Sequence, residues 1–415
     1  MFLALCLGWP SLTASQEAIA LDGDIAPGTG GGTYLFFYGA SINDSSDVVF
    51  IAAVAGDPAR IGIFLESNAG GGAVVLDGEP SSGTNGGVFR GFLTAKSNDF
   101  GQVVFLARIA GGTALRGIFL SSAGSHIPIA LSADPAPGTG GGVFADFFWT
   151  PSLNDSGAVV FNAAISGGDA ASGIFSYVDG AVSAIALEGE PAPGIPGFVF
   201  DTFGGPVLNA GGEVAFAAIV HSESALRYVI YIHSSGSTSV AAISGEAPIG
   251  GGGAVYDSFP FDGLAFTAPG DVYFDAGLKS SEPRSPTGIF VDSVLSPGEA
   301  LVLEGSIAPG TTGGTFLPQT SSPSANDSGA VAFRASVTGG SSRSGVFMSS
   351  QSSTSTIAVE GGLAPETAGG VYDGFREPPS INASGSVAFT ADVRNGSATE
   401  GSFWYRSRAR ALALS

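Results

Sequence analysis

The sequence has few of the residues that build metal centres and phosphate contacts. Its 415 residues include one cysteine, Cys6, and three histidines, with no Cys pair and no His-x-x-x-His spacing that would suit a zinc site. Lys and Arg number 15 against 36 Asp and Glu, and the 15 form no basic patch. The net charge of −21 therefore argues against nucleic acid and anionic membranes as partners.

Long apolar runs are also missing, although hydrophobic residues make up 44% of the chain. A membrane helix needs roughly 20 consecutive apolar residues, and Gly and Ser interrupt every apolar segment well before that length, so no membrane span is expected. The N-terminus is apolar over Phe2–Trp9 and continues with the small residues Thr13–Ser15, which is typical of an export signal. We expect residues 1–18 to be an export segment, although no Lys or Arg follows Met1.

The main feature of the sequence is an eight-residue pattern, Asn-x-x-Gly-x-x-x-Phe, that occurs seven times. Successive copies start 55 to 59 residues apart, at Asn43, Asn98, Asn154, Asn209, Thr267, Asn326 and Asn382. Each copy is followed by a Gly-Ile-Phe-like group and then by a group whose best form is Leu-acid-Gly-acid-x-Ala-Pro-Gly, as in Leu21–Gly28. Three patterns in a fixed order and at a fixed period indicate a repeat protein, with one domain over residues 19–415.

Each repeat favours strands over helices, because its apolar segments are short, rich in Val, Ile, Phe and Ala, and separated by turn residues. The third repeat predicts four strands, over residues 143–153, 158–165, 173–177 and 182–187. The turn Asn154–Gly157 joins the first two strands and places Phe161 in the core. A four-stranded meander cannot bury both of its faces alone, so neighbouring copies must stack.

We therefore predict an all-β, seven-bladed β-propeller built from seven four-stranded repeats, since four strands a blade and four to eight blades are usual. A parallel β-helix would have shorter and more uniform repeats, and a row of β-sandwich modules would need roughly 90 residues each. The chain opens on a fourth-strand pattern, Ile19–Leu21, and ends on a similar one, Ala411–Leu414. We expect both termini to complete one blade, which leaves one such strand too many for seven blades.

Carboxylates recur at two positions of the third pattern, each in five of the seven copies. The first position holds Asp22, Asp77, Glu188, Glu304 and Glu360, and the second holds Asp24, Glu79, Asp134, Glu190 and Glu246. A propeller would place them in a ring on one face, where their oxygens could hold Ca²⁺. The candidate Ca²⁺ ligands are Asp22, Asp24, Asp77, Glu79, Glu188 and Glu190. The alternative, which we favour, is that they only solvate an apolar loop, because Ca²⁺ loops bring three or more oxygens in one segment.

No catalytic residue and no cofactor can be assigned from the sequence. Gly-rich segments such as Thr139–Gly142 precede strands, whereas a phosphate loop needs a following helix. The fifth copy departs from the others, with Thr267 for Asn, and Ile230 stands in the preceding Gly-Ile-Phe position. Larger side chains occur near Ile230, at Arg227, Tyr228, Tyr231 and His233. This divergence indicates either a binding face or decay of a redundant repeat. Three other aromatic residues could stack on a sugar or fill gaps between sheets: Trp149, Trp404 and Tyr405.

At the repeated positions of this pattern the chain resembles the bacterial exported proteins named for an Asn-x-x-Gly-x-x-x-Phe tandem repeat. Those proteins carry one of several alternative C-terminal surface anchors. The resemblance covers residues 19–405 and rests on copies such as Asn154–Phe161 and Asn326–Phe333. It implies export and a surface role, and it implies no activity. The chain departs from the family after Phe403, where no apolar anchor helix follows, so we expect either a released protein or an incomplete sequence.

The sequence thus predicts a secreted or cell-surface, monomeric propeller that acts as a non-catalytic binding, adhesion or structural module, with an extracellular polysaccharide or a surface protein as partner. The alternative is an extracellular hydrolase or lyase acting on polysaccharide, with Ca²⁺ held by the acidic loops. A weaker third hypothesis is that the acidic face binds a cationic polymer or mineral. An enzyme would bring unrepeated carboxylates, His or Arg from different blades to the axis, whereas a scaffold would line the axis with symmetric copies.

Overall fold

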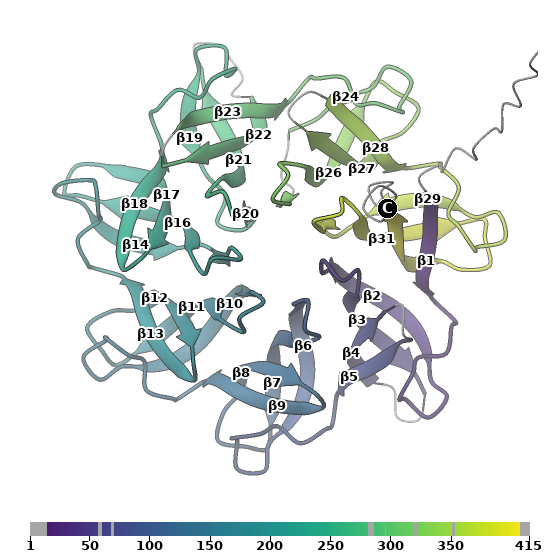
Figure 1. Ribbon diagram of the computed structural model, residues 1–415, viewed down its shortest axis with the longest axis horizontal. Coiled ribbons are helices and arrows are strands. Elements are labelled where there is room, and N and C mark those ends of the chain that lie inside the picture. Colours follow the sequence, from purple (N-terminus) through teal and green to yellow (C-terminus); the bar gives the residue numbers. More distant parts are fainter. Residues whose placement is uncertain are drawn as a thin grey trace, which may run out of the picture.

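Seven antiparallel sheets surround a central axis (Figure 1). The computed structural model describes residues 15–406 apart from 57–59, 68–69, 281–285, 295, 319–321 and 351–352. Over these residues the secondary structure consists of strands and turns, and no helix there is long and apolar enough to cross a membrane. The predicted all-β, seven-bladed propeller is confirmed.

The first three blades each have four strands, which follow one another from the axis outward. Blade one holds β2 (Thr33–Ile42), β3 (Val48–Ala55), β4 (Arg60–Glu66) and β5 (Gly72–Leu76). Blade two holds β6 (Val88–Ser97), β7 (Val103–Ala110), β8 (Arg116–Ser122) and β9 (Ser125–Leu131). Blade three holds β10 (Val143–Leu153), β11 (Val159–Ser166), β12 (Ser172–Val178) and β13 (Ala181–Leu187), each within one residue of its predicted bounds.

In the next three blades the inner strand is interrupted and forms two short pieces. Blade four holds β14 (Val199–Phe203), β15 (Val207–Leu208), β16 (Val214–His221), β17 (Leu226–Ser234) and β18 (Ser237–Ile243). Blade five holds β19 (Val255–Ser258), β20 (Leu264–Phe266), β21 (Val272–Lys279), β22 (Thr287–Ser293) and β23 (Ser296–Leu303). Blade six holds β24 (Thr315–Phe316), β25 (Ser324–Ala325), β26 (Val331–Thr338), β27 (Ser344–Ser350) and β28 (Ser353–Val359). The inner strands of blades one to three shift register at the same place, so this stretch is irregular in each of these six blades.

Both ends of the described chain complete the seventh blade, as predicted. It holds β29 (Val371–Phe375), β30 (Ser380–Ile381), β31 (Val387–Arg394) and β32 (Glu400–Arg406), together with β1 (Ser15–Leu21). β1 is the outer strand and pairs antiparallel with β32. Residues 15–18 of the expected export segment therefore pair within this blade. The expected last strand, Ala411–Leu414, lies outside the described residues.

Each blade has a core of aromatic rings contributed by its inner three strands. Phe161 is 1% exposed and stacks on Phe175, with ring centroids 5.7 Å apart, while Phe144 meets Phe175 edge-on at 5.0 Å. Both geometries are favourable for aromatic pairs, and the other blades repeat them. The repeat patterns predicted the rings on the second and third strands. They missed the ring on the inner strand, at Tyr34, Phe89, Phe144, Phe200, Tyr256, Phe316 and Tyr372.

In blade four the ring of the third strand belongs to Tyr231, and the assignment of this position to Ile230 was wrong. Phe216 pairs with Tyr231 across β16 and β17, and the two rings stack at 5.5 Å. One more residue separates the rings of the second and third strands here than in blades one to three. A fixed spacing from Phe216 therefore selects the neighbouring side chain, Ile230. Part of the divergence of this repeat is therefore a change in hairpin length.

The Asn of the repeat closes its own turn and also joins adjacent blades. The Asn43 side chain accepts a hydrogen bond from the backbone N–H of Asp47 at 2.7 Å and donates one to the carbonyl oxygen of Asn98, in the next blade, at 2.8 Å. The link recurs in five other blades and includes Asn382 to Asn43, which joins the last blade to the first at 3.1 Å. It is broken at Thr267, whose hydroxyl donates within its own turn. The Asn of the repeat therefore does more than shape its own turn, which is the only role that the sequence indicated.

Candidate functional site

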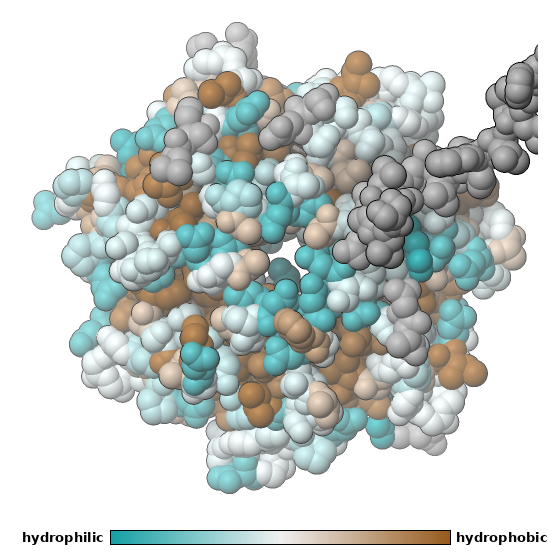
Figure 2. Space-filling view, in the orientation of Figure 1, coloured by the Kyte–Doolittle hydropathy of each residue, from teal (hydrophilic) through white to brown (hydrophobic). Residues whose placement is uncertain are grey.

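The inner strands surround a central cavity of about 780 Å³, whose opening is seen at the centre of the face in Figure 2. Its wall consists of the residues that precede the Asn of each repeat, together with a few side chains of the second strands. Because every blade contributes the same positions, the wall can be compared blade by blade.

Two residues before the Asn, the wall repeats a serine in four blades. These residues are Ser41, Ser152, Ser324 and Ser380. Three of the hydroxyls accept a hydrogen bond from a backbone N–H of the next blade at 3.1 to 3.2 Å: Ser152 from Leu208, Ser324 from Ile381 and Ser380 from Ile42. This layer therefore supplies a second set of links between blades.

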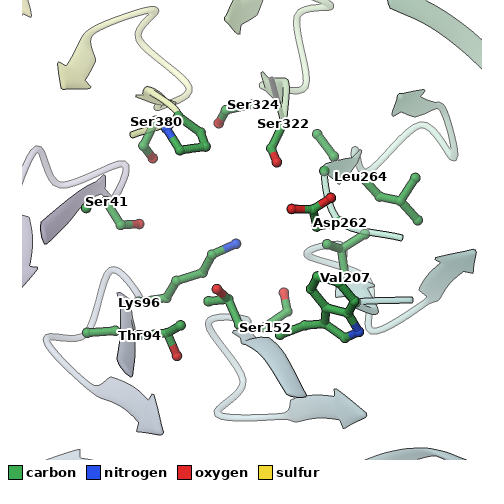
Figure 3. A pocket seen from close by; sticks show the side chains of 18 of the residues that line it. Ser41, Thr94, Lys96, Ser152, Val207, Asp262, Leu264, Ser322, Ser324 and Ser380 are labelled. Atoms are coloured by element: carbon green, nitrogen blue, oxygen red, sulfur yellow. The ribbon is translucent and has the colours of Figure 1, made fainter. Parts of the chain in front are cut away.

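Blade two places Lys96 at the serine position, and its side chain points into the channel (Figure 3). The residue is only partly exposed, and loss of water around its ammonium lowers the pKa of Lys96. Over the residues that the structure describes, the ammonium makes no hydrogen bond or ion pair. A desolvated charge without a partner is unfavourable, so the fold alone does not explain this lysine.

Five residues before the Asn, no residue type recurs among the described blades. The residues are Tyr38, Leu93, Trp149, Gly204, Asp262 and Glu377, in blades one to five and seven. Tyr38, Leu93 and Trp149, which we call the apolar arc, come from three consecutive blades and line the cavity. Asp262 and Glu377, which we call the acidic side, line it from blades five and seven. The repeat symmetry of the wall is lost at this level.

The apolar arc is accessible and partly strained. Tyr38, Leu93 and Trp149 are 48%, 39% and 38% exposed, so three consecutive blades present an accessible apolar side chain to the cavity. Trp149 also has a φ of 62°, a left-handed conformation that is uncommon for a bulky residue. Blade four leaves room for it, since a Cβ on Gly205 would lie 3.0 Å from the Cβ of Trp149.

A third carboxyl group, which is buried, lies near Asp262 of the acidic side. Asp262 is exposed, and its carboxylate points into the channel from the side opposite Lys96 (Figure 3). Asp275 of the same blade is 4% exposed, and its Oδ1 has no partner in the described part of the chain. Burial, and then the charge of Asp262, raises the pKa of Asp275 well above its usual range. Asp275 therefore tends to hold a proton beside Asp262.

Four further aspartates follow the Asn of the repeat: Asp44, Asp99, Asp155 and Asp327. Each accepts a backbone N–H of the preceding blade at 2.5 to 3.0 Å, so these carboxylates also link blades. Burial is the main cause that raises the pKa of Asp44, and the charges of the other three add to it. Negative charge thus gathers around the axis.

The predicted Ca²⁺ ligands lie in the loops between blades, where most of them accept structural hydrogen bonds. Asp22 accepts from the N–H groups of Thr399 and Glu400, and Glu188 from the hydroxyl of Ser172. Asp24 and Glu190 accept from the N–H of the Leu three residues earlier, Asp77 faces Arg90 at 3.8 Å, and Glu79 is partly exposed. In the described ranges no three His, Cys, Asp or Glu side chains are grouped so that they could hold a metal ion.

The whole repeat array matches a model of protein sequence families. The model is described as a family of unknown function, DUF7453, and it matches three times in tandem, over residues 7–115, 110–227 and 223–414. The chain belongs to this family. The tandem matches agree with the repeat character of the sequence, and the name of the family carries no activity.

Comparison of this DUF7453 chain with curated proteins found no match. Among solved structures it is similar to the β-propeller domain of the Trilobed protease from Pyrococcus furiosus, with 7% identity, a TM-score of 0.50, and coverage of 90% of this chain and 96% of that one. It is also similar to a puromycin-hydrolyzing peptidase from Mycobacterium tuberculosis, with 12% identity, a TM-score of 0.48, and coverage of 96% of this chain and 57% of that one. A third similar structure is the polysaccharide lyase Uly1, with 10% identity, a TM-score of 0.45, and coverage of 94% of this chain and 98% of that one. Likeness at such low identity shows the propeller fold alone.

Sequence analysis of the DUF7453 chain missed Lys96, Asp262 and Glu377, because they lie outside the three recurring patterns. They can be found by aligning the seven copies on the Asn and comparing the residues that precede it. Of the three aromatic residues considered for sugar stacking, only Trp149 lines the channel, while Trp404 is buried between sheets. Arg227, Tyr228 and His233 lie on β17, outside the channel wall.

Proposed function

We propose that the protein is a secreted or cell-surface binding module that holds an extracellular polysaccharide in its central channel. The observation that carries the proposal is the loss of repeat symmetry five residues before the Asn. There the apolar arc faces the acidic side, whereas two residues before the Asn a serine recurs in four of the seven blades. A scaffold that only held its blades together would repeat at this level too. The resemblance to exported Asn-x-x-Gly-x-x-x-Phe proteins supports a location outside the cell.

The chemistry of the wall suits a sugar. A sugar ring has an apolar face of C–H groups, which packs on aromatic side chains, and hydroxyl groups, which donate to carboxylates. Tyr38 and Trp149 offer the first kind of contact, and Asp262 and Glu377 offer the second. The cavity of about 780 Å³ lies within the usual range of ligand pockets. It suits one end of a polysaccharide better than a folded protein.

The test is an array of neutral, acidic and amino-bearing oligosaccharides, probed with the full chain and two variants. Trp149→Ala removes one ring of the apolar arc, and Phe100→Ala removes an exposed ring outside the channel wall. We expect binding to at least one class of oligosaccharide, weakened about tenfold or more by Trp149→Ala, as for loss of a central aromatic contact, and unchanged by Phe100→Ala. No binding to any class, or an equal loss in both variants, would contradict the proposal.

An extracellular hydrolase or lyase acting on polysaccharide is the second candidate, and Asp275 is the observation that favours it. Glycosidases divide acid and base roles between a protonated and an ionised carboxyl group that both flank the scissile bond. Asp275 is buried behind the channel wall, so in this hypothesis Asp262 contacts the substrate and Asp275 acts through Asp262. Incubation with the oligosaccharides that bind, followed by assays for new reducing ends and new double bonds, tests it. Turnover abolished by Asp262→Asn would identify an enzyme, and binding without turnover would exclude one for those sugars.

A further inference from the structure

We propose that the channel selects a polysaccharide whose terminal residue carries a carboxylate, a uronic acid, and that Lys96 binds this carboxylate. The inference rests on the proposed function and names the chemistry of its ligand. It starts from Lys96, the one cation among the described residues of the wall, which otherwise present hydroxyls, apolar groups and carboxylates.

The fold does not require Lys96, because four other blades have serine at this position. In three of them the serine hydroxyl accepts a bond from the next blade, a contact that an ammonium cannot make because it has no acceptor. Blade two therefore gives up a link between blades and places three N–H donors in the channel. Over the described residues those donors have no acceptor, so an acceptor must come from water or from a ligand.

A carboxylate is the acceptor that gains most at this place. A hydrogen bond between two charged groups is roughly twice as strong as one between neutral groups, and the gain grows where water is partly excluded. Ser152 lies near Lys96 in Figure 3 and lines the cavity; its hydroxyl oxygen accepts from the backbone N–H of Leu208, so its own proton can be donated to the second carboxylate oxygen. A neutral sugar offers only hydroxyl oxygens to the same ammonium.

The acidic side fixes the orientation of such a ligand. Asp262 and Glu377 repel a carboxylate and accept hydrogen bonds from hydroxyls, so a uronic acid enters with its charge toward Lys96 and its hydroxyls toward Asp262. The C–H face of the ring then lies along Tyr38 and Trp149. A net charge of −21 and the aspartates beyond the Asn level oppose entry of a long polyanion. We therefore assign the site to one terminal residue of an acidic chain.

The experiment is calorimetric titration of the full chain with three trisaccharides: a uronic acid trimer, the same trimer with its carboxyl groups reduced to alcohols, and a glucosamine trimer. Lys96→Ser introduces the residue of four other blades, so the variant is expected to fold, and its thermal unfolding midpoint verifies this. Lys279→Ser, which changes the only other lysine of the chain, is the matched control. Lys279 is exposed at the end of β21, outside the channel wall.

We expect the uronic acid trimer to bind at least tenfold more tightly than its reduced form. Lys96→Ser should remove this preference, because it weakens binding of the uronic acid trimer about tenfold more than binding of the reduced trimer, which loses only a hydrogen bond to a neutral hydroxyl. Lys279→Ser should alter neither affinity. Equal affinity for the two trimers, weakened together by Trp149→Ala, would overturn the inference and leave the proposed function intact. Tighter binding of the glucosamine trimer would also overturn it, because selection would then belong to the acidic side. Failure of all three trimers to bind, in a chain that binds no member of the array, would remove both proposals.

Discussion

At the residue scale, recurrence separates side chains that hold the ring together from side chains that the ring does not need. The Asn of the repeat makes the same pair of hydrogen bonds wherever it occurs, and the serine two residues earlier also links blades in three cases. Lys96 replaces the recurring serine, Asp262 and Glu377 stand at a position where no residue type recurs, and all three line the channel. In a repeat protein, a residue that departs from its column at a shared surface is the better candidate for function.

Thr267→Asn should stabilise the protein, because it adds the one link that is missing between blades. In the other blades the Asn amide donates to a carbonyl oxygen of the next blade; here that oxygen belongs to Asn326, which accepts the N–H of Gly329 and has a second lone pair for the new donor. A net gain of about 0.5–1.5 kcal/mol in the free energy of unfolding is expected for one hydrogen bond. Urea denaturation of the two proteins measures it, and a loss of stability would contradict the role given to the Asn ring.

Asp292 should make the stability of the propeller depend on pH. Burial, and further the charge of Glu246, raises the pKa of Asp292 to about 7, against an opposing hydrogen bond from Ser293. A raised folded-state pKa favours the protonated form, so this contribution is complete below the unfolded pKa of about 4 and is lost as pH rises through about 7. Relative to Asp292→Asn, the wild type should lose stability between pH 4 and pH 8 in chemical denaturation. A constant difference between the two proteins would rule this out.

At the element scale, each blade is a hairpin series closed by turns and filled by rings from three strands. The local signals for this were sufficient: Gly and Asn mark the turns, and short β-branched and aromatic runs mark the strands. All four strands of blade three were therefore predicted within one residue. The ring position of blade four was not, because one added residue in a hairpin changes which side chain pairs with Phe216 across the strands. Spacing along the chain cannot show that, whereas cross-strand pairing does.

Substitutions to Phe at Tyr231 and at Ile230 should change the stability in opposite directions, which tests the pairing of β16 with β17. Tyr231→Phe restores the ring of the other blades and removes a buried hydroxyl that has no partner in the described structure, so stability should rise by about 1 kcal/mol. Ile230→Phe places an additional ring in a fully buried site and should cost about 1–3 kcal/mol. Thermal unfolding compares the two variants, and the reverse order would show that Ile230 holds the ring position.

The loops between blades allow a direct test of the Ca²⁺ prediction. Asp22, Asp24, Glu188 and Glu190 already accept hydrogen bonds, and binding to the native state alone must raise the unfolding midpoint. We expect no rise in millimolar Ca²⁺. A rise that a chelator reverses, and that Glu188→Gln with Glu190→Gln abolishes, would establish these loops as metal sites and strengthen the enzyme hypothesis.

At the scale of the whole molecule, the seven blades close into a ring whose channel wall carries side chains that do not repeat from blade to blade. β1 completes the last blade by pairing with β32, and Asn382 reaches Asn43 across the same junction. The period of the repeat predicts this ring, because seven equal units that cannot bury their faces alone must stack. It cannot predict the channel wall, because the residues there that matter are those that do not repeat. Function in this protein is therefore argued from departures from the repeat and fold from the repeat itself.

The most direct test of the account is a single variant with three changes in the unrepeated layer, Trp149→Ala, Asp262→Asn and Glu377→Gln, assayed for both stability and binding. If the layer serves a ligand, the free energy of unfolding of the variant should lie within about 1 kcal/mol of the wild-type value, as is usual for surface substitutions. The variant should also fail to bind the oligosaccharides that the wild type binds. A strongly destabilised variant that still binds as the wild type does would contradict the central claim, since the layer would then be part of the scaffold.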